Sequence, residues 1–433
     1  MKQNRRQFLF GIAPLVLPAT VLGRGGAVPP SDRVNVAMIG MGRQAVQVNV
    51  VQLLGMPDVQ VVAVCDVDAW RLQNAKRQVE QAYAQKAPTG SYTGCLAYND
   101  FREVLANRSI DGVMISTPDH WHVPISMEAL EAGKDVSCEK PLTRSIGEGR
   151  QLSDLVTKLQ RVFRTDSEFR SLDNFYRAVE LVRNGRIGKL KTIRTGVPLD
   201  QLACPPPAEM PVPPELNYER WQGPAPRAPY TEKRVHTPHS YERGGWMRHL
   251  YYCDGMITNW GYHLNDIAQW GNGTDRTGPI EIEGHGEWPP ANNFWNVPLT
   301  FEINYRYANG VRLVYKVEKP YVKFEGDEGC IYAEYGKPLE VEPASILHSF
   351  IKEAEIHFPF KTDKQDFIDA VKTRGHTLED AEVGHRTTSV CHLGHIAIRL
   401  GKRLEWDPAT ERFSNSDEAN AWVNKRILTP EHA

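Results

Sequence analysis

The sequence predicts a two-domain α/β protein, with a doubly wound parallel sheet first and then an α/β domain built on a large, mostly antiparallel sheet with one open face. Three observations predict this fold class. A β-branched apolar run at residues 34–39 ends in a glycine turn, and further apolar runs alternate with helix-compatible segments up to about residue 155. Later runs are joined by tight turns. The 433 residues, 41% of them hydrophobic, suffice for two domains.

The overall charge argues against two classes of partner. A formal net charge of -2 gives no broad basic field, so we expect neither nucleic acid nor an anionic membrane surface as a partner. A small neutral or mildly anionic substrate fits better. The seven cysteines form no C-x-x-C pair and no compact framework, so we expect mostly small buried hydrophobes and no disulfide scaffold.

Residues 1–32 are expected to be an export signal and linker. Arg5 and Arg6 precede an apolar run at residues 8–22, and small residues follow, which is the order typical of a twin-arginine signal. The run is too short for a good membrane span, so we expect no stable membrane insertion. We expect the twin-arginine machinery to export the folded chain to the periplasm or another space outside the cytoplasm. That route accommodates an odd number of unpaired cysteines.

The first domain, expected at residues 33–155, opens on a strand and the pattern G-x-G-x-x-A. Gly40 permits the tight turn, Gly42 lets the backbone approach a pyrophosphate, and the small Ala45 allows close helix packing. Arg43 and Gln44 lie in the same loop and are assigned to the cofactor with it. Because a strand precedes the loop and a helix-compatible stretch follows, we predict a dinucleotide-binding Rossmann unit with the anion at a helix N-terminus.

Residues at the ends of the next strands are expected to complete the cofactor site. Asp66 ends the second strand and is placed to accept hydrogen bonds from both adenosine ribose hydroxyls. A carboxylate there repels a 2'-phosphate, which favours NAD over NADP. Ligands of such sheets sit at the carboxyl ends of strands, so the end of the strand predicted at 111–118 and the polar turn at 119–122 should contribute Thr117, Pro118, His120 and His122. His120 and His122 also suggest a metal pair, but no third ligand follows at metal spacing, and we predict no metal.

The last strand of the first domain delivers Cys138-Glu139-Lys140-Pro141. Proline removes a backbone donor and biases Lys140 away from the helical region, so its side chain projects from an extended turn. We interpret Lys140 as a catalytic cation. The alternative is a surface lysine at a strand end.

These motifs together resemble the Gfo/Idh/MocA family of NAD(P)-dependent sugar oxidoreductases. The resemblance is carried by G-x-G-x-x-A, Ser116-Thr117-Pro118, and Glu139-Lys140-Pro141-Leu142 after Ala132-Gly133-Lys134. In that family the lysine is the catalytic cation and the glutamate helps to hold the nicotinamide riboside, and the resemblance implies these roles for Lys140 and Glu139. It also implies a homodimer or homotetramer formed through the open sheet face.

The second domain is expected at residues 156–422, followed by a tail at 423–433. It contains a second group of candidate site residues at 259–266. On a helix, Asn259, His263 and Asp266 fall on one face. This is similar to the family's D-x-x-x-H-x-x-D helix, whose histidine is the proton acceptor, a role that the resemblance implies for His263. Asn259 departs from the pattern because an amide supplies no negative charge, so catalysis is expected to be slower, shifted to higher pH, or different in kind. The alternative for His263 is a satisfied histidine on a buried helix.

The segment at 203–229 is rich in proline and is predicted to be an irregular excursion outside any central sheet. Aromatic and basic residues in and after it suit a sugar, which offers apolar ring faces and hydroxyls; a solvated loop is the alternative. His392, on a later predicted helix, is a weaker site candidate. The expected substrate contacts are Lys140, Arg170, Trp221, Arg234, His236, Asn259, His263 and Asp266.

The remaining chain is predicted to supply the antiparallel sheet and its covering helices. Runs at 299–307 and 311–317 flank Asn309-Gly310, a hairpin turn signal, and a further strand pair is expected at 322–324 and 330–335. Helices are expected from residue 363 and over 383–401.

These residues together predict an exported pyranoside dehydrogenase that oxidises a secondary hydroxyl, with C3 of a glucoside as the candidate position. His263 would remove the hydroxyl proton, Lys140 would stabilise the alkoxide, and hydride would pass to the nicotinamide. Since no free NAD is supplied outside the cytoplasm, the cofactor is expected to stay bound. One alternative is a redox-neutral, NAD-dependent glycoside hydrolase. The other is a sugar-binding module without turnover, which the presence of both Lys140 and His263 disfavours.

Overall fold

The first domain is a parallel sheet of six strands. The computed structural model describes residues 28–201 and 203–429, and the expected export signal lies outside them. The strand order is β3-β2-β1-β4-β5-β6, which is the order of a dinucleotide-binding sheet, so this half of the predicted fold is confirmed. The strands are β1 (Val34–Ile39), β2 (Val59–Cys65), β3 (Leu96–Tyr98), β4 (Gly112–Ile115), β5 (Asp135–Glu139) and β6 (Phe163–Asp166).

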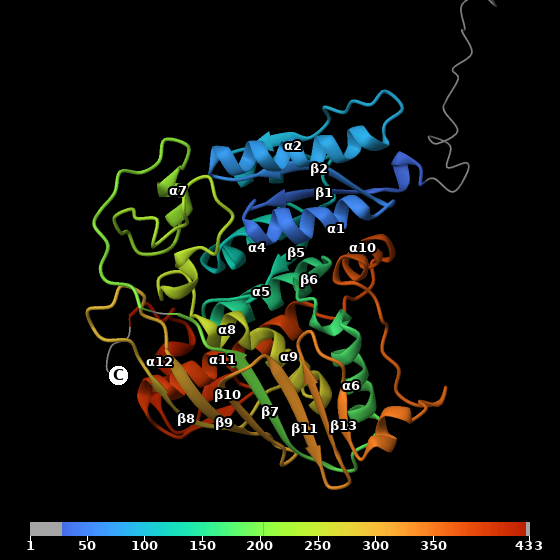
Figure 1. Ribbon diagram of the computed structural model, residues 1–433, viewed down its shortest axis with the longest axis vertical. Helices are drawn as coiled ribbons and strands as arrows, with labels where there is room; N and C mark the ends of the chain where they lie inside the picture. Colours follow the sequence, from blue (N-terminus) through green and yellow to red (C-terminus); the bar gives the residue numbers. More distant parts are fainter. Residues whose placement is uncertain (1–27, 202, 430–433) are drawn as a thin grey trace, which may run out of the picture.

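Helices cover both faces of this sheet (Figure 1). The chain leaves the glycine turn through one π-helical turn at Ala45–Asn49 before the first α-helix begins. Polar side chains cap several N-termini, as when the Asp68 carboxylate accepts the Arg71 backbone N–H. The helices are α1 (Val50–Gly55), α2 (Ala69–Lys86), α3 (Phe101–Ala106), α4 (His122–Glu131) and α5 (Ile146–Leu159).

Two segments beyond the expected boundary at residue 155 belong physically to the first domain. Strand β6 pairs in parallel register with β5, and Val136 lies opposite Phe163. Helix α10 (Asp363–Thr373) comes from far along the chain, yet its Phe367 and Ile368 are buried in the same apolar cluster as Val36. The late part of the chain therefore completes the core of the first domain.

The second domain is built on a sheet of nine strands, in the order β13-β12-β11-β7-β10-β9-β8-β14-β15. The β7–β10 pair is parallel and the other pairs are antiparallel, which confirms the predicted mostly antiparallel sheet. The strands are β7 (Leu190–Pro198), β8 (Glu281–Glu287), β9 (Thr300–Arg306), β10 (Arg312–Glu318), β11 (Tyr321–Gly326), β12 (Cys330–Glu334), β13 (Glu340–Glu342), β14 (Leu404–Asp407) and β15 (Arg412–Phe413).

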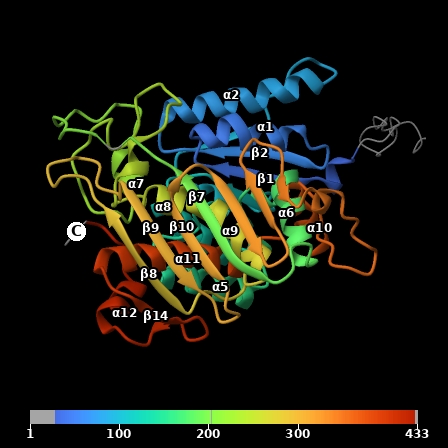
Figure 2. The ribbon, with the colours of Figure 1, turned by 60° about the horizontal axis from the view of Figure 1, so that its bottom comes forward.

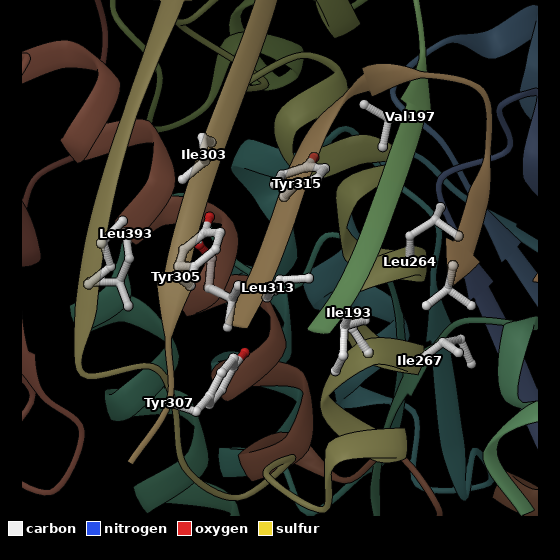
Figure 3. Packing of buried hydrophobic residues seen from close by; sticks show 14 of the residues in the cluster. Ile193, Val197, Leu264, Ile267, Ile303, Tyr305, Tyr307, Leu313, Tyr315 and Leu393 are labelled. Carbon is white, nitrogen blue, oxygen red and sulfur yellow. The ribbon is translucent and has the colours of Figure 1, made fainter. Parts of the chain in front are cut away.

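Helices cover one face of this sheet and leave the other open. Figure 2 looks onto the open face, with the helices behind the strands. On the covered side Leu313 and Tyr315 are fully buried, whereas Val314 between them is only half-buried, as the two-residue period of a strand requires. Figure 3 shows this core, with Tyr305 and Leu393 packed between sheet and helix. The helices of this domain are α6 (Asp173–Arg183), α7 (Tyr218–Gln222), α8 (Met256–Asn259), α9 (Gly261–Asn272), α11 (Ala381–Leu400) and α12 (Asp417–Val423).

The long connection between β7 and α8 returns to the first domain, and we call residues 203–250 of it the crossing segment. Its Asn217 N–H donates to the Val67 carbonyl at 2.9 Å, and its Glu215 carbonyl accepts the Ala69 N–H at 2.9 Å. In Figure 1 the segment lies with α7 beside α2 and α4. Among the described residues, no helix combines the length and the apolar character needed to cross a membrane.

Candidate active site

A cavity of about 870 Å³ lies at the carboxyl ends of the first sheet's strands. Its walls come from the glycine turn, the ends of β2, β4, β5 and β6, the crossing segment, and helices α8 and α9. This is where ligands of doubly wound sheets bind, and the volume is that of a site for a sizeable organic molecule. The cavity therefore joins the expected cofactor residues to the expected catalytic residues.

The glycine turn forms an open cradle at one end of the cavity. Gly40 has φ +87°, and a Cβ there would lie 2.7 Å from the Thr117 backbone nitrogen, so only glycine fits. At Gly42 a Cβ would meet nothing closer than the Arg71 guanidinium at 3.8 Å, so a ligand can approach the backbone. Arg43 and Gln44 also line the cavity. This cradle fits the pyrophosphate of a dinucleotide.

Asp66 lies directly after β2 and beside this cradle, and its carboxylate accepts two backbone hydrogen bonds. Its Oδ2 accepts the Met41 N–H at 2.6 Å and its Oδ1 accepts the Asp68 N–H at 2.8 Å. Burial raises the pKa of Asp66, and the charge of Arg71 opposes this rise. The carboxylate thus ties the glycine turn to the end of β2 while it lines the cavity.

The turn after β4 contributes Thr117, Pro118 and His122 to the cavity wall. The ring nitrogens of His122 lie 2.8 Å from the Pro141 carbonyl and 2.9 Å from the Thr117 carbonyl, so this histidine joins two loops. His120 corrects the prediction because it is fully buried away from the cavity, where its Nε2 lies 2.9 Å from the Trp221 carbonyl. It packs the crossing segment against the first domain.

Glu139 and Lys140 stand side by side where the two domains meet. The Glu139 Oε1 accepts a hydrogen bond from Asn49 Nδ2 at 2.9 Å. Burial and, after it, the charge of Asp166 raise the pKa of Glu139 to about 8. Lys140 Nζ donates to the Asn259 backbone carbonyl at 3.1 Å. This contact brings the predicted cation of the first domain to the predicted helix of the second.

His263 lines the cavity as a nearly buried imidazole with 5% exposure. Its Nδ1 lies 2.8 Å from the Ser167 hydroxyl, and its ring stacks on Phe169 at a centroid distance of 4.2 Å. Burial, and next the charge of Lys140, lower the pKa of His263 well below its usual value. If Nδ1–H donates to Ser167, the Nε2 lone pair is left for a substrate proton. A neutral histidine held in this way can act as a base.

Helical spacing placed Asp266 on the same face as His263, but the structure does not bring it to the cavity. Asp266 is fully buried and forms a bidentate pair with Arg170, at 2.7 Å from Nε to Oδ2 and 2.7 Å from Nη2 to Oδ1. Arg170, also predicted to contact substrate, is 2% exposed and likewise absent from the wall. Both predictions are corrected. Asp266, one turn after His263, faces the core of the second domain, and its pair with Arg170 supports helix α9 on the side away from the cavity.

The crossing segment contributes two of its three predicted contacts. Trp221 and His236 line the cavity. Arg234 does not, since its Nη1 lies 3.0 Å from His249 Nε2 and its guanidinium packs on Phe294. His392 is also absent from the wall, buried with its Nε2 3.1 Å from the Thr143 carbonyl. The conformation of the crossing segment decides which of its side chains face the cavity. A proline-rich sequence does not reveal that conformation.

Sequence reasoning missed an aromatic group at the catalytic end, namely Phe169, Trp260 and Tyr335, and the neighbouring Glu168. Phe169 stacks on Tyr335 at 5.3 Å, and Trp260 meets Tyr335 edge-on. Glu168 and Phe169 follow β6, so recognition of that strand as part of the first sheet would have indicated them. Tyr335 follows β12 in the other sheet, and no local pattern identifies it.

A glycine cradle at a helix start, an acid at the end of the second strand, and a lysine–histidine pair beside them define an NAD-binding oxidoreductase. Models of one such family match both domains. The model "Oxidoreductase family, NAD-binding Rossmann fold" matches residues 34–167, and "Oxidoreductase family, C-terminal alpha/beta domain" matches residues 206–432. The chain belongs to the Gfo/Idh/MocA oxidoreductase family.

Curated relatives include proteins named as glycosidases. The chain is 30% identical over 259 residues to a glycosyl hydrolase family 109 protein of Stenotrophomonas maltophilia (strain K279a), a match that covers 56% of this chain and 52% of that protein. It is 34% identical over 140 residues to an alpha-N-acetylgalactosaminidase of Shewanella oneidensis, covering 32% of this chain and 29% of that protein. The matches thus span about half or less of these relatives.

Solved structures share the fold at low sequence identity. GenD2 from gentamicin A biosynthesis, in complex with NAD, has a TM-score of 0.61 at 17% identity over 88% of this chain and 98% of that chain. The aldose-aldose oxidoreductase of Caulobacter crescentus, complexed with glycerol, has a TM-score of 0.61 at 16% identity, and the match covers 86% of this chain and 99% of that chain. The WlbA dehydrogenase of Bordetella pertussis, in complex with NADH and UDP-GlcNAcA, has a TM-score of 0.63 at 15% identity, and the match covers 87% of this chain and 99% of that chain.

Proposed function

We propose that this protein is an NAD-dependent oxidoreductase that transfers hydride between a secondary hydroxyl of a pyranose or glycoside and a tightly bound nicotinamide, with C3 as the candidate carbon. The observation that carries the proposal is the position of Lys140 and His263 on one cavity wall, next to the dinucleotide cradle. The aromatic group of Phe169, Trp260 and Tyr335 beside them suits the apolar faces of a sugar ring. Membership of the family supplies the cofactor class.

Each catalytic group has a distinct task in this proposal. The bound nicotinamide would supply the hydride acceptor. His263 takes the hydroxyl proton on Nε2, because its lowered pKa keeps the ring neutral and ready to accept. Lys140 stabilises the negative charge that develops on the oxygen. Glu139 is protonated at neutral pH, since its pKa is about 8, and can offer a hydrogen bond to the nicotinamide riboside.

The cofactor proposed is NAD, bound tightly enough to stay with the protein during turnover. Asp66 places a carboxylate beside the cradle and disfavours a 2'-phosphate. The crossing segment lies over the same cavity and is tied to the first domain, for example by the Arg71 Nη2 bond to the Ser240 carbonyl at 2.8 Å. A dinucleotide beneath this segment would leave only when its contacts open.

A second candidate is a redox-neutral glycoside hydrolase, in which transient oxidation by the bound NAD labilises the glycosidic bond. The observation that favours it is the 30% identity to a protein named as glycosyl hydrolase family 109. The crossing segment also lines the cavity, and its Trp221 offers an aromatic surface that could contact an aglycone. Both candidates begin with the same oxidation.

We further propose that the protein works outside the cytoplasm after twin-arginine export and assembles as a homodimer or homotetramer. The Arg5-Arg6 pair before an apolar run supports the first proposal. The open face of the nine-stranded sheet supports the second. Light scattering of the purified protein tests the assembly, and a monomer at micromolar concentration would contradict it.

The deciding experiment is mass spectrometry of products after the cofactor-loaded protein is incubated with a panel of glucosides and galactosides. A product two hydrogens lighter than its substrate, with the glycosidic bond intact, establishes the dehydrogenase. Free sugar and released aglycone without net NADH establish the glycosidase. Unchanged substrates throughout the panel contradict both. The Lys140→Ala variant is the control for background chemistry.

A further inference from the structure

We propose that Glu168 supplies, from the end of β6, the negative charge beside the reacting groups that Asn259 does not supply from helix α8. Glu168 would offset the positive charges of Lys140 and of the imidazolium formed on His263. The chemistry of this inference rests on the proposed function. Nothing in the helical motif indicates it, because the carboxylate comes from a different domain.

The position of Glu168 is fixed by its neighbours on both sides. It follows β6 and lines the cavity, and its side chain is half-buried. The preceding residue, Ser167, contacts His263 Nδ1 at 2.8 Å, and the following residue, Phe169, stacks on the same ring. The backbone that carries Glu168 is therefore anchored to the imidazole that it would serve.

The carboxylate of Glu168 is not committed to another cation. It forms no ion pair in the described part of the chain, whereas the nearby Asp166 pairs with Lys364. Burial raises the pKa of Glu168, and Lys140 is the charge that lowers it most, with smaller opposed effects from Asp363 and Lys364. Lys140 is thus the cation to which this carboxylate responds.

The other acids near His263 do not provide the missing charge. Glu139, next to Lys140, has a pKa of about 8 and is protonated at neutral pH. Asp266 on α9 is neutralised by its bidentate pair with Arg170. Asp119, after β4, also lines the cavity without an ion pair among the described residues, but the charges that act on it most are those of His122 and Arg144, ahead of Lys140. Glu168 is the acid on the cavity wall for which Lys140 is the leading charge.

The need for such a charge follows from the proton transfer. In the proposed oxidation the hydroxyl O–H bond would break and its proton would pass to His263 Nε2. The carbon that bears the hydroxyl would lose a hydride, which a bound nicotinamide would accept, and a carbonyl would form. Two cations, Lys140 and the imidazolium, then stand together in a buried place, which is costly without an anion. Glu168 forms and breaks no bond; its charge would offset that of Lys140, the charge that lowers the pKa of His263, and would so make His263 a stronger base.

The first test is Glu168→Gln in the cofactor-loaded protein. We expect kcat to fall about 10- to 100-fold with cofactor content unchanged. The acid limb of the pH–rate profile should move to lower pH, because His263 then holds its proton less firmly. The double variant E168Q/N259D should recover part of the lost rate, since it restores a carboxylate on the other wall. Glu353→Gln, an exposed residue outside the cavity, is the matched control.

The second test needs no turnover and so judges Glu168 separately from the proposed function. The ring nitrogen resonances of His263, assigned with His263→Asn, are followed through a pH titration. The midpoint should be lower in Glu168→Gln than in the wild type and unchanged in Glu353→Gln. An unmoved midpoint, or a loss of rate with an unmoved profile and no recovery in the double variant, overturns the inference. A panel in which no sugar reacts contradicts the proposed function alone.

Discussion

The Lys140 ammonium and the His263 imidazole come from different domains and meet at one cavity. Lys140 is anchored by the Asn259 carbonyl, and its charge is the second cause, after burial, of the lowered pKa of His263. The imidazole is thereby kept neutral, as the base of the proposed reaction must be. The oxygen of a substrate between them would meet both a proton acceptor and a positive charge.

Removal of this cation should abolish most of the turnover. Lys140→Ala is expected to lower kcat by roughly 10²- to 10⁴-fold while NAD stays bound, because most of the cradle lies elsewhere. Steady-state rates and cofactor absorbance of the purified protein measure the two effects. Lys319→Ala, which removes an exposed lysine paired with Glu334 on the sheet, is the control. Near-normal turnover in Lys140→Ala would remove the proposed mechanism.

The carboxylate at the second strand should decide between NAD and NADP. Asp66→Ala is expected to shift the ratio of NADP to NAD affinity by about tenfold or more, since 1.4 kcal/mol of relieved repulsion suffices. Asp66→Asn distinguishes the loss of charge from the loss of the hydrogen bond that holds the glycine turn, because it removes the charge and keeps one acceptor for the Met41 N–H. Titration of cofactor-depleted protein measures both affinities. An unchanged ratio in both variants would contradict the assignment.

His120 should make the folded state sensitive to acid. Burial lowers its pKa to about 3, against roughly 6.5 in an unfolded chain. The unfolded state binds the extra proton between these values, so this group costs the folded state about 1.4 kcal/mol per pH unit as pH falls below 6.5. The free energy of unfolding of His120→Gln should fall less steeply over that range. Urea titrations at several pH values measure this free energy. If its dependence on pH is parallel in the variant and the wild type, His120 does not make the folded state sensitive to acid.

Which residues share a helix face could be predicted from the sequence, but how deep each one lies could not. Asn259 and His263 reach the cavity, whereas Asp266 one turn later is buried with Arg170. Both spacings, i to i+4 from Asn259 and i to i+3 from His263, keep a residue on one helical face, so the difference in depth comes from what packs against α8 and α9. The glycine cradle was easier to predict because its conformation is local, as the φ of +87° at Gly40 illustrates.

At the scale of elements, the crossing segment lines the cavity and is bonded to the first domain. Trp121 Nε1 is 3.1 Å from both the Arg220 and Trp221 carbonyls, and Arg71 reaches the Ser240 carbonyl. The excursion itself was predicted from its prolines. Its place over the first domain was not, because it has neither helical nor strand periodicity and its contacts are mostly to backbone carbonyls.

Loosening of this segment should release the cofactor faster. Trp121→Phe keeps the aromatic ring but loses the donor shared by the two carbonyls, and we expect the dissociation rate of NAD to rise about 2- to 10-fold. Displacement by excess labelled NAD measures the rate. Trp406→Phe, in β14 away from the cavity, is the matched control and should release NAD at the wild-type rate. Equal rates in all three proteins would show that the segment does not retain the cofactor.

At the scale of the whole molecule, the domain boundary in the sequence differs from the boundary in space. Helix α10 lies in the chain between β13 and β14 of the nine-stranded sheet, yet it packs on the first domain through Phe367 and Ile368. The strand pattern predicted both sheets. The return of α10 was not predictable, because an amphipathic helix reveals that it has a buried face but not which surface covers that face.

This packing should dominate the stability of the first domain. Phe367→Ala is expected to lower the free energy of unfolding by about 3–5 kcal/mol, since it removes a buried ring next to Gly112. Phe360→Ala, at a residue 53% exposed just before the helix, should change it by less than about 1 kcal/mol. Urea unfolding measures both. Similar values for the two variants would show that α10 is peripheral.

The place of α10 also sets an order of events during synthesis. A nascent chain that ends before residue 363 has all six strands of the first sheet, but an apolar patch on that sheet still lacks its cover. A ribosome-bound chain that ends before residue 363 should therefore need a chaperone to shield this patch until α10 is made.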